Sequence, residues 1–151
     1  MQPSSRFPVG DLEAHLRFLK LLHGMLLTSV ALYGVALWFL ADEIEAREPT
    51  LPLWPFLLMA GILAALVLYL HQTRIQPLLR DATREPSQRI VQLRFNYIVC
   101  YVLAETVALF GFVTRFLGGS WGEAAPFFVV SVLLFGVCYP RRPATLTTPL
   151  G

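Results

Sequence analysis

The stretch LLTSVALYGVALWFL, residues 26–40, decides the fold class of this chain, because it carries no charge and is almost wholly apolar on every side. A helix of a soluble protein would instead show a polar face with a period of about 3.6 residues. The apolar run extends from about Leu21 to Ala41, and a bilayer-spanning helix needs roughly 17 to 25 such residues. It is longer than the roughly 7 to 15 apolar residues of a signal sequence, so we expect a mature membrane helix.

Three further apolar runs follow the first, and together they predict an all-α polytopic membrane protein. Hydrophobic residues make up 56% of the chain and charged residues 15%, whereas an ordinary soluble domain is about one quarter charged. The last run is short and ends before Pro140, so it fits a thin or locally thinned bilayer. A soluble four-helix bundle is the alternative that this pattern disfavours. We predict a transmembrane domain over 11–142, with helices at about 18–41, 53–71, 94–117 and 124–139, between disordered tails at 1–10 and 143–151.

The basic residues are concentrated in the segments on one side of these predicted helices. Positive charge in short loops marks the cytoplasmic side, so we expect both termini and the loop 71–94 in the cytoplasm, at a bacterial inner membrane. The loop also has the charge to contact anionic lipid or a partner protein, although the topology signal alone accounts for it. Ten of the twelve basic residues lie on this side: Arg6, Arg17, Lys20, Arg74, Arg80, Arg84, Arg89, Arg94, Arg141 and Arg142.

Aromatic residues at the predicted helix ends agree with this orientation, because Trp and Tyr favour the headgroup level of a membrane. The outer boundary carries Trp38, Trp54 and Trp121, and the inner boundary Tyr69, Tyr97 and Tyr139. Arg115 falls near the outer boundary, where we expect its side chain to extend to the headgroups.

Residues 26–40 and 103–117 resemble each other at a constant offset of 77, with seven of fifteen positions identical. A polar loop and a helix led by Pro55 or Pro126 follow the two copies. We predict a duplicated helical hairpin whose copies run in the same direction, since parallel repeats are a known construction of membrane folds.

Glu105 is the candidate functional residue, because it lies in the otherwise uncharged stretch YVLAETVALFGFV, residues 101–113. Comparable ionisable side chains at the centre of a membrane helix cost roughly 2.5 to 3.5 kcal/mol, so such a residue indicates a function. Hydrocarbon disfavours the charged carboxylate, and we expect Glu105 to bind a proton for much of the time. The alternative, of about equal weight, is a structural side chain that hydrogen-bonds Thr28 or Ser29 and holds two helices together.

Polar and small residues accompany Glu105 on the first and third predicted helices. The spacing of Tyr97 and Tyr101 places both on one helix face with Glu105, within reach of a phenol–carboxyl contact. We predict a supporting polar face of Thr28, Ser29, Tyr97, Tyr101 and Thr106, and close helix packing at Gly24, Ala31, Gly34, Ala104, Ala108 and Gly111.

The sequence carries no pattern typical of a cofactor site or of an enzyme. The three histidines have no pair at the i, i+4 spacing of two ligands on one helix face. The two cysteines, Cys100 and Cys138, fall near the same boundary and are expected to be buried free thiols. We therefore expect no metal, no cofactor, no nucleic-acid partner and no catalytic activity.

Ala104-Glu105, followed by Ala108 to Val113, resembles the carboxylate helix of the rotary ATPase proteolipid, subunit c, and Arg84-Glu85-Pro86 resembles the loop that precedes it. The likeness covers residues 84–113 and implies that Glu105 binds a translocated proton or sodium ion. The glycine-rich helix of that family has no counterpart here. In its duplicated members the acid lies on the second helix of each hairpin, whereas Glu105 lies on the first.

Two functions from different classes fit these observations. The first is a proteolipid-like subunit that handles protons in a transport or energy-coupling complex, and the second is a structural or accessory subunit in which Glu105 packs helices. A small transporter with its site between the repeats is a third, less supported by the few polar residues present. We expect the lipid bilayer as a partner, together with a homo-oligomer or a larger membrane complex.

Overall fold

The computed structural model of the chain describes residues 9–41, 52–80 and 86–141, and this part is helical and contains no strand. The helix α3 (Trp54–Leu70) continues without a break through a π turn, η1 (His71–Ile75), into α4 (Gln76–Arg80), so these three elements form one rod. In chain order the elements are α1 (Val9–Phe39), α3 (Trp54–Leu70), η1 (His71–Ile75), α4 (Gln76–Arg80), α5 (Pro86–Phe116) and α6 (Trp121–Val137).

Three helical segments are long and apolar enough to cross a membrane: Glu13–Phe39, Trp54–Arg80 and Gln88–Phe116. The fourth helix, α6, has only 17 residues and is a shorter apolar helix. The prediction of an all-helical fold is therefore confirmed for the described residues, and three helices have the length and apolar composition of membrane spans. As the short fourth apolar run indicates, α6 is too short to be counted with them. Two helices begin before their predicted starts: α1 begins at Val9 and α5 at Pro86. The added residues are more polar than the apolar runs from which the helices were predicted.

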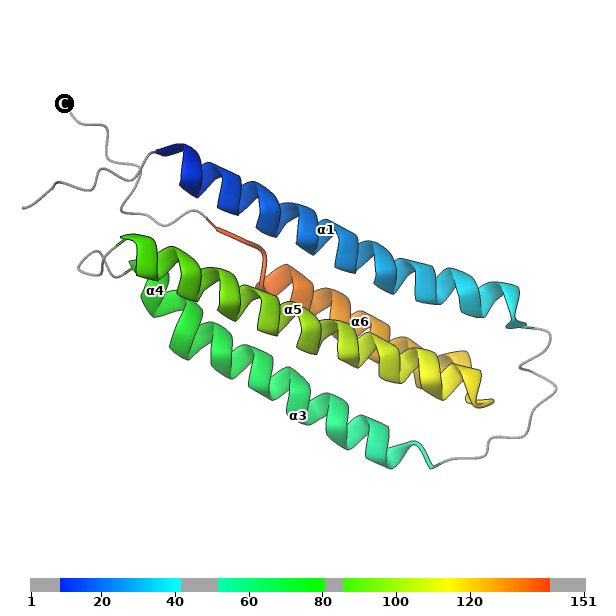
Figure 1. Cartoon of the computed structure of the whole chain (residues 1–151). Helices are drawn as coiled ribbons and strands as arrows, with labels where there is room; N and C mark the ends of the chain where they lie inside the picture. Colours follow the sequence, from blue (N-terminus) through cyan, green and yellow to red (C-terminus); the bar gives the residue numbers. More distant parts are fainter. Residues whose placement is uncertain (1–8, 42–51, 81–85, 142–151) are drawn as a thin grey trace, which may run out of the picture.

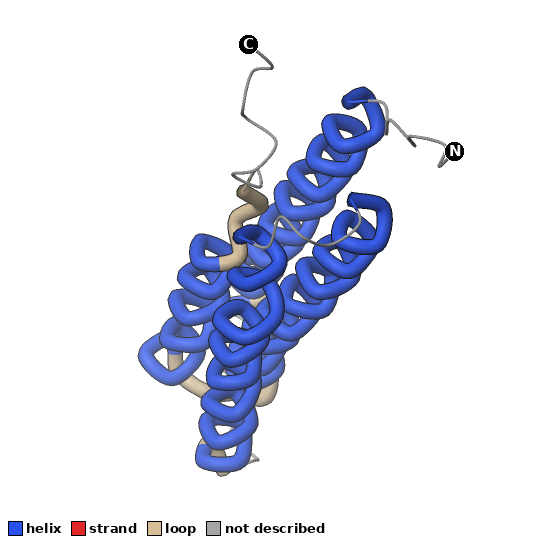
Figure 2. The backbone as a smooth tube through the Cα atoms, turned by 90° about the vertical axis from the view of Figure 1, so that its left-hand side faces the viewer, coloured by secondary structure: helices blue, strands red, loops and turns tan. Residues whose placement is uncertain are grey.

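The helix α5 is the centre of the fold, and α1, the α3 rod and α6 each pack against it (Figure 1). The helices α1 and α5 run in one direction, and α3 and α6 run in the other (Figure 1). Figure 2, turned so that the left-hand side of Figure 1 faces the viewer, shows the helices side by side in one bundle.

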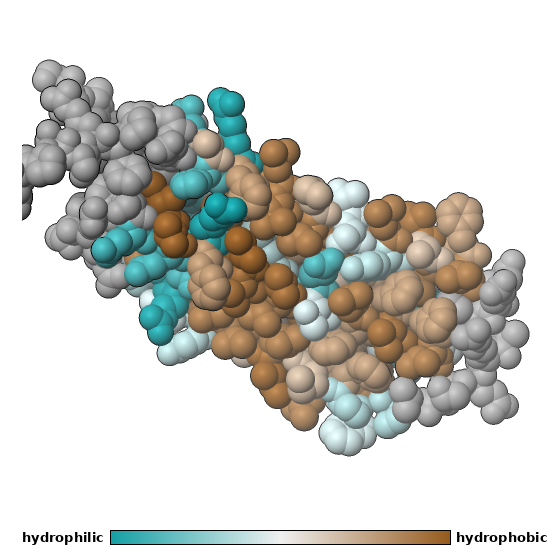
Figure 3. Space-filling view, viewed as in Figure 1, coloured by the Kyte–Doolittle hydropathy of each residue, from teal (hydrophilic) through white to brown (hydrophobic). Residues whose placement is uncertain are grey.

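The two ends of the bundle differ in chemistry. At the end near α4, called the basic end below, hydrophilic side chains gather, whereas the middle of the visible face is mostly hydrophobic (Figure 3). The described basic residues of this end are Arg17, Lys20, Arg74, Arg80, Arg89, Arg94 and Arg141. The opposite end carries Trp38, Trp54 and Trp121, all exposed.

The closest packing joins α5 to α6. Ala104 and Ala108 are fully buried, and a Cβ on Gly111 would lie 2.9 Å from Cβ of Phe127. The buried hydroxyl of Ser131 donates a hydrogen bond to the backbone oxygen of Ala104 at 2.8 Å. The three small residues predicted for helix packing on this helix therefore do bring a neighbouring helix close.

The connection between α5 and α6 is set by local sequence. Gly118 has a positive φ of 93°, which ends α5 in the left-handed region that glycine adopts without strain. Ser120 then begins α6 in a capping box: its hydroxyl accepts from the backbone N–H of Glu123, and the Glu123 carboxylate accepts from the backbone N–H of Ser120.

Two boundary residues differ from their predicted environments. Tyr97 is only 1% exposed and belongs to the core, so it is not an aromatic anchor like the exposed Tyr69 and Tyr139. Arg115 is 3% exposed and donates to the backbone oxygen of Gly119 at 3.0 Å, with its guanidinium 5.3 Å from the Trp121 ring centroid. Its guanidinium stays in the turn that follows α5 instead of extending to the headgroups, because the Gly119 carbonyl and the Trp121 ring hold it there.

The two copies of the repeat lie in α1 and α5, which are parallel neighbours, but their residues have different surroundings. A Cβ on Gly34 would meet no atom within 4 Å, whereas its counterpart Gly111 is in close contact with α6. In the second half of the likeness α6 packs closely on α5, but in the first half the α3 rod packs on α5 and not mainly on α1. The likeness in sequence is thus not matched by a likeness in packing.

Candidate functional site

Glu105 lies on α5 where this helix faces α1, and two hydroxyl groups of α1 donate to it. The Oγ of Ser29 is 2.5 Å from Oε1 of Glu105, and the hydroxyl of Tyr33 is 2.9 Å from the same oxygen. Ser29 and Tyr33 are four residues apart, one turn of helix, so both point from one face of α1. All three side chains are half-buried.

The carboxyl group lies well inside the helical span. Within Gln88–Phe116, Glu105 is seventeen residues from one end and eleven from the other, or about 25 Å and 16 Å along the axis. Because the hydrocarbon core is only about 30 Å thick, neither end of the helix brings this group to the surface of a bilayer. Its hydrogen-bond partners must therefore come from the protein, and the structure supplies two of them.

Ser29 has a second partner that changes what the site can do. Its Oγ lies 2.8 Å from the backbone oxygen of Leu26 as well as 2.5 Å from Glu105, and a hydroxyl has one proton to donate. When Glu105 is charged, Ser29 donates to the carboxylate, and an O···O distance near 2.5 Å is typical of such a charge-assisted bond. A carboxylic acid at this position would instead donate to Ser29, whose own proton would then be free for the Leu26 carbonyl.

The second carboxyl oxygen, Oε2, makes no hydrogen bond with any residue in the described ranges. A proton bound there leaves Oε1 free to accept from Ser29 and Tyr33. Both hydroxyls of α1 therefore have an acceptor at Oε1, while Oε2 takes no part in these two bonds.

The predicted polar face is only partly assembled. The structure brings Ser29 to Glu105, but Thr28 donates to the backbone oxygen of Gly24 and Thr106 to that of Val102, both at 2.8 Å. These two threonines satisfy their hydroxyls within their own helices, a common arrangement that leaves them outside the site.

The expected approach of an α5 phenol to Glu105 is wrong. The hydroxyl of Tyr101 donates to the backbone oxygen of Cys138 at 3.2 Å, and Tyr97 is buried beside Tyr101 with a ring-centroid distance of 6.0 Å. The phenol that does reach the carboxyl is Tyr33 of α1, which the sequence reading missed. The available signal was its i, i+4 spacing from Ser29, which puts both hydroxyls on one face.

The small residues of α1 do not pack against another helix as those of α5 do. A Cβ on Gly24 or Gly34 would meet nothing within 4 Å, and Ala31 is exposed. Ala31 and Gly34 line a shallow apolar groove between α1 and α6, together with Phe128. Close packing at these three positions of α1 was predicted and is not found.

A second set of side chains joins α1 to α5 and α6 nearer the basic end. The ring of His23 packs edge-on against those of Tyr101, Phe135 and Tyr139, with centroids 5.3 to 5.5 Å apart. Cys100 and Cys138 are buried free thiols that interact with each other, and the carbonyl of Cys138 accepts the hydrogen bond from Tyr101. In the part of the chain that the structure describes, no three His, Cys, Asp or Glu side chains come together as a metal site would require.

Comparison with known proteins adds no relative: the chain matches no protein-family model, no curated protein and no solved structure.

Proposed function

We propose that this chain is a small integral membrane protein in which Glu105 binds and releases a proton, as a subunit of a transport or energy-coupling complex. The observation that carries the proposal is the shared hydroxyl of Ser29, within reach of both Glu105 and the Leu26 carbonyl. This arrangement supplies a hydrogen-bond partner for either protonation state of the acid. Intramembrane carboxyl groups that gain and lose protons form the relays of pumps and transporters.

The resemblance of residues 84–113 to the rotary ATPase proteolipid supports the same proposal. In that family the acid of the corresponding helix binds the transported ion. The motif directs its small residues and its acid toward different helices. Its small residues, Ala104, Ala108 and Gly111, lie on the side of α5 that faces α6, whereas Glu105 faces α1.

The test is infrared difference spectroscopy on the protein in lipid nanodiscs across the pH range in which its helical content is constant. We expect the C=O band of a protonated carboxyl group to fade as pH rises, and to be absent from Glu105→Gln. A carboxyl band that does not change with pH, or that persists unchanged in Glu105→Gln, would contradict proton binding at this site.

The alternative is an accessory subunit in which Glu105 only holds α1 and α5 together through hydrogen bonds. The two bonds from Ser29 and Tyr33 support this alternative as well as they support proton binding. The side-chain oxygen of a glutamine accepts both bonds, so this alternative predicts that Glu105→Gln assembles and functions normally. Loss of coupled transport in that variant, at unchanged protein level and unchanged complex assembly, would argue for the proton-binding role.

We further propose that α1 and α5 descend from one duplicated hairpin. A separate proposal is that the basic end faces the cytoplasm of a bacterial cell. The charge distribution supports the orientation, since positive residues near membrane helices are retained on the cytoplasmic side. Reporter fusions after residue 151 test it: a reporter active only in the cytoplasm should be active there, and a reporter active only outside should be silent.

A further inference from the structure

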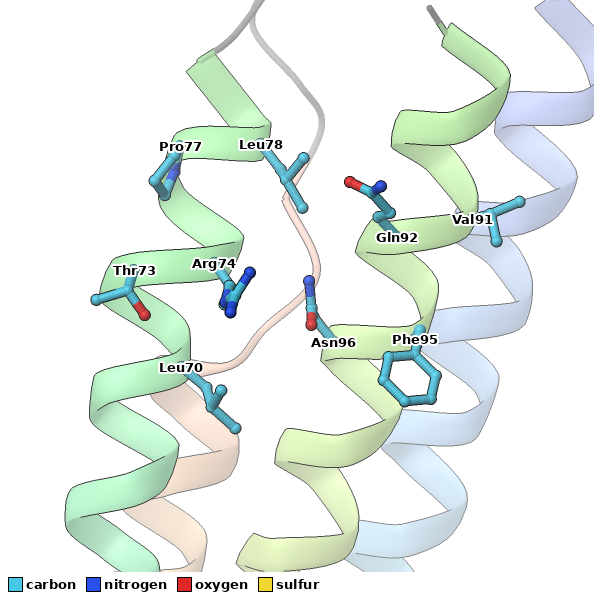
Figure 4. A pocket seen from close by; sticks show the side chains of 9 residues that line it. All are labelled: Leu70, Thr73, Arg74, Pro77, Leu78, Val91, Gln92, Phe95 and Asn96. Carbon is cyan, nitrogen blue, oxygen red and sulfur yellow. The ribbon is translucent and has the colours of Figure 1, made fainter. Parts of the chain in front are cut away.

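A cleft of about 690 Å³ opens at the basic end between the α3 rod and α5, far along the bundle from Glu105. The side chains of Arg74, Gln92 and Asn96 reach into the space between the two helices (Figure 4). Apolar side chains, among them Leu70 and Phe95, complete its walls. The volume is within the range of about 300 to 1,000 Å³ that is typical of ligand sites in proteins.

The wall on the α3 side is built by the π turn. The backbone N–H of Gln76 donates to the oxygen of His71, five residues before it, which widens the helix at this point. A π turn inside a helix shifts the side chains that follow it and is frequently found at functional sites. Within this turn Ile75 is fully buried, while its neighbour Arg74 lines the cleft and remains exposed.

The polar groups of the cleft suit a phosphate. Arg74 makes no hydrogen bond or ion pair with any described residue, and neither does Asn96. None of the described residues that line the cleft is acidic, so no side chain among them neutralises the guanidinium. A guanidinium binds a phosphate through two parallel N–H···O bonds, and an amide N–H adds a third donor.

The depth of the cleft favours a lipid over a free ion. The rod from Trp54 to Arg80 has 27 residues and is about 40 Å long, close to the full thickness of a bilayer with its headgroups. Arg74 lies six residues before the end of the rod, or about 9 Å, from where its long side chain reaches the headgroup phosphates. Leu70 lies about one turn further along the rod, toward the apolar middle of the bundle, where acyl chains would lie in a bilayer.

We propose that this cleft binds the phosphate headgroup of an anionic phospholipid, with Arg74 and Asn96 on the phosphate and the apolar wall of Leu70 and Phe95 against the glycerol and the first part of the acyl chains. The interaction is specific to the cleft, and it is distinct from the general attraction of basic residues to an anionic surface.

The experiment is native mass spectrometry of the protein in detergent micelles, titrated with phosphatidylglycerol or phosphatidylcholine. The titration counts the lipids bound to each chain, and the variants show which residue holds the tightly bound one. We expect one tightly bound phosphatidylglycerol per chain and weaker binding of phosphatidylcholine. Arg74→Gln should weaken the phosphatidylglycerol site about tenfold or more, since it removes a charge-assisted pair, and Arg74→Lys should lie between.

Arg80→Gln is the matched control, because it removes the same charge from an exposed position of the same rod outside the cleft. It should leave the bound lipid unchanged to within about twofold, and both variants should keep the elution volume and helicity of the parent because both side chains are exposed. Equal weakening by Arg74→Gln and Arg80→Gln would overturn the proposal. So would displacement of the lipid by millimolar inorganic phosphate, since the cleft would then be a site for small anions.

Discussion

Oγ of Ser29 and Oε1 of Glu105 are 2.5 Å apart, and this contact joins α1 to α5 across 76 positions of sequence. It matters for the fold because α1 packs mainly against α5 and has few contacts with α6. A helix attached along one seam depends on the polar contacts in that seam, since lipid competes equally well for its apolar side chains.

Replacing Ser29 with alanine removes this hydrogen bond and should weaken the attachment of α1. Hydrogen bonds between membrane helices contribute about 0.6 kcal/mol on average and at most about 1.7 kcal/mol, and we expect the upper half of this range because the acceptor is a carboxyl group. The free energy of unfolding, measured by titration with denaturing detergent in mixed micelles, checks the value.

Thr28→Ala is the control for Ser29→Ala, because Thr28 is the adjacent residue and its hydroxyl is bonded only within α1. It should change the free energy of unfolding by less than about 0.5 kcal/mol. If both variants lower the free energy of unfolding by the same amount, the loss comes from removing any hydroxyl group of α1. The bond from Ser29 to Glu105 would then make no contribution of its own.

Tyr33→Phe should be coupled to Ser29→Ala, because the two hydroxyls donate to the same carboxyl oxygen. When one donor is removed, Oε1 still has the other, so the second loss should cost more than the first. The double variant should therefore be less stable than the sum of the single effects by about 0.5 kcal/mol or more, as measured in a double-mutant cycle. Additive effects would show that the hydroxyls act independently.

The sequence predicts the helical fold because apolar composition along the chain is enough to identify membrane helices. It places Glu105 between helices and offers Thr28 or Ser29 as its partner, of which the structure shows Ser29. The sequence does not choose between the two, since that choice depends on the rotation of α1 about its axis. A rotation of one residue, about 100°, decides whether Thr28 or Ser29 faces α5. The apolar surface of α1 is too uniform to fix that rotation, which is why Tyr33 was missed and why Gly24 was assigned to a contact it does not make.

The capping box at the start of α6 makes part of the stability dependent on pH. The backbone N–H of Ser120 donates to the exposed carboxylate of Glu123 and holds the pKa of this group below its ordinary value. A carboxyl group with a lowered pKa in the folded state stabilises the fold fully above its unfolded pKa, about 4.3, and loses this contribution as pH falls through the folded pKa. The thermal midpoint of the parent should therefore fall toward that of Glu123→Gln below about pH 4.3. A difference between the two proteins that is constant with pH would contradict a charged cap.

Gly111 and Gly34 occupy equivalent positions of the repeat, yet only Gly111 touches a neighbour. An alanine at 111 would place its Cβ 2.9 Å from Cβ of Phe127 and 3.0 Å from the backbone oxygen of Ala124, and neither atom can move without shifting α6. Overpacking of this kind costs about 1 to 3 kcal/mol, so Gly111→Ala should lower the free energy of unfolding by that amount.

Gly34→Ala adds the same methyl group to α1, where it meets no atom within 4 Å. Alanine has the higher helix propensity, so this variant should be neutral or slightly more stable, by up to about 1 kcal/mol. Parallel unfolding titrations of the two variants test the packing of both helices at once. Equal destabilisation would mean that α1 buries Gly34 against a neighbour, either in the folded chain or in an assembly with another copy. Equal tolerance would mean that α5 and α6 are further apart than the structure shows.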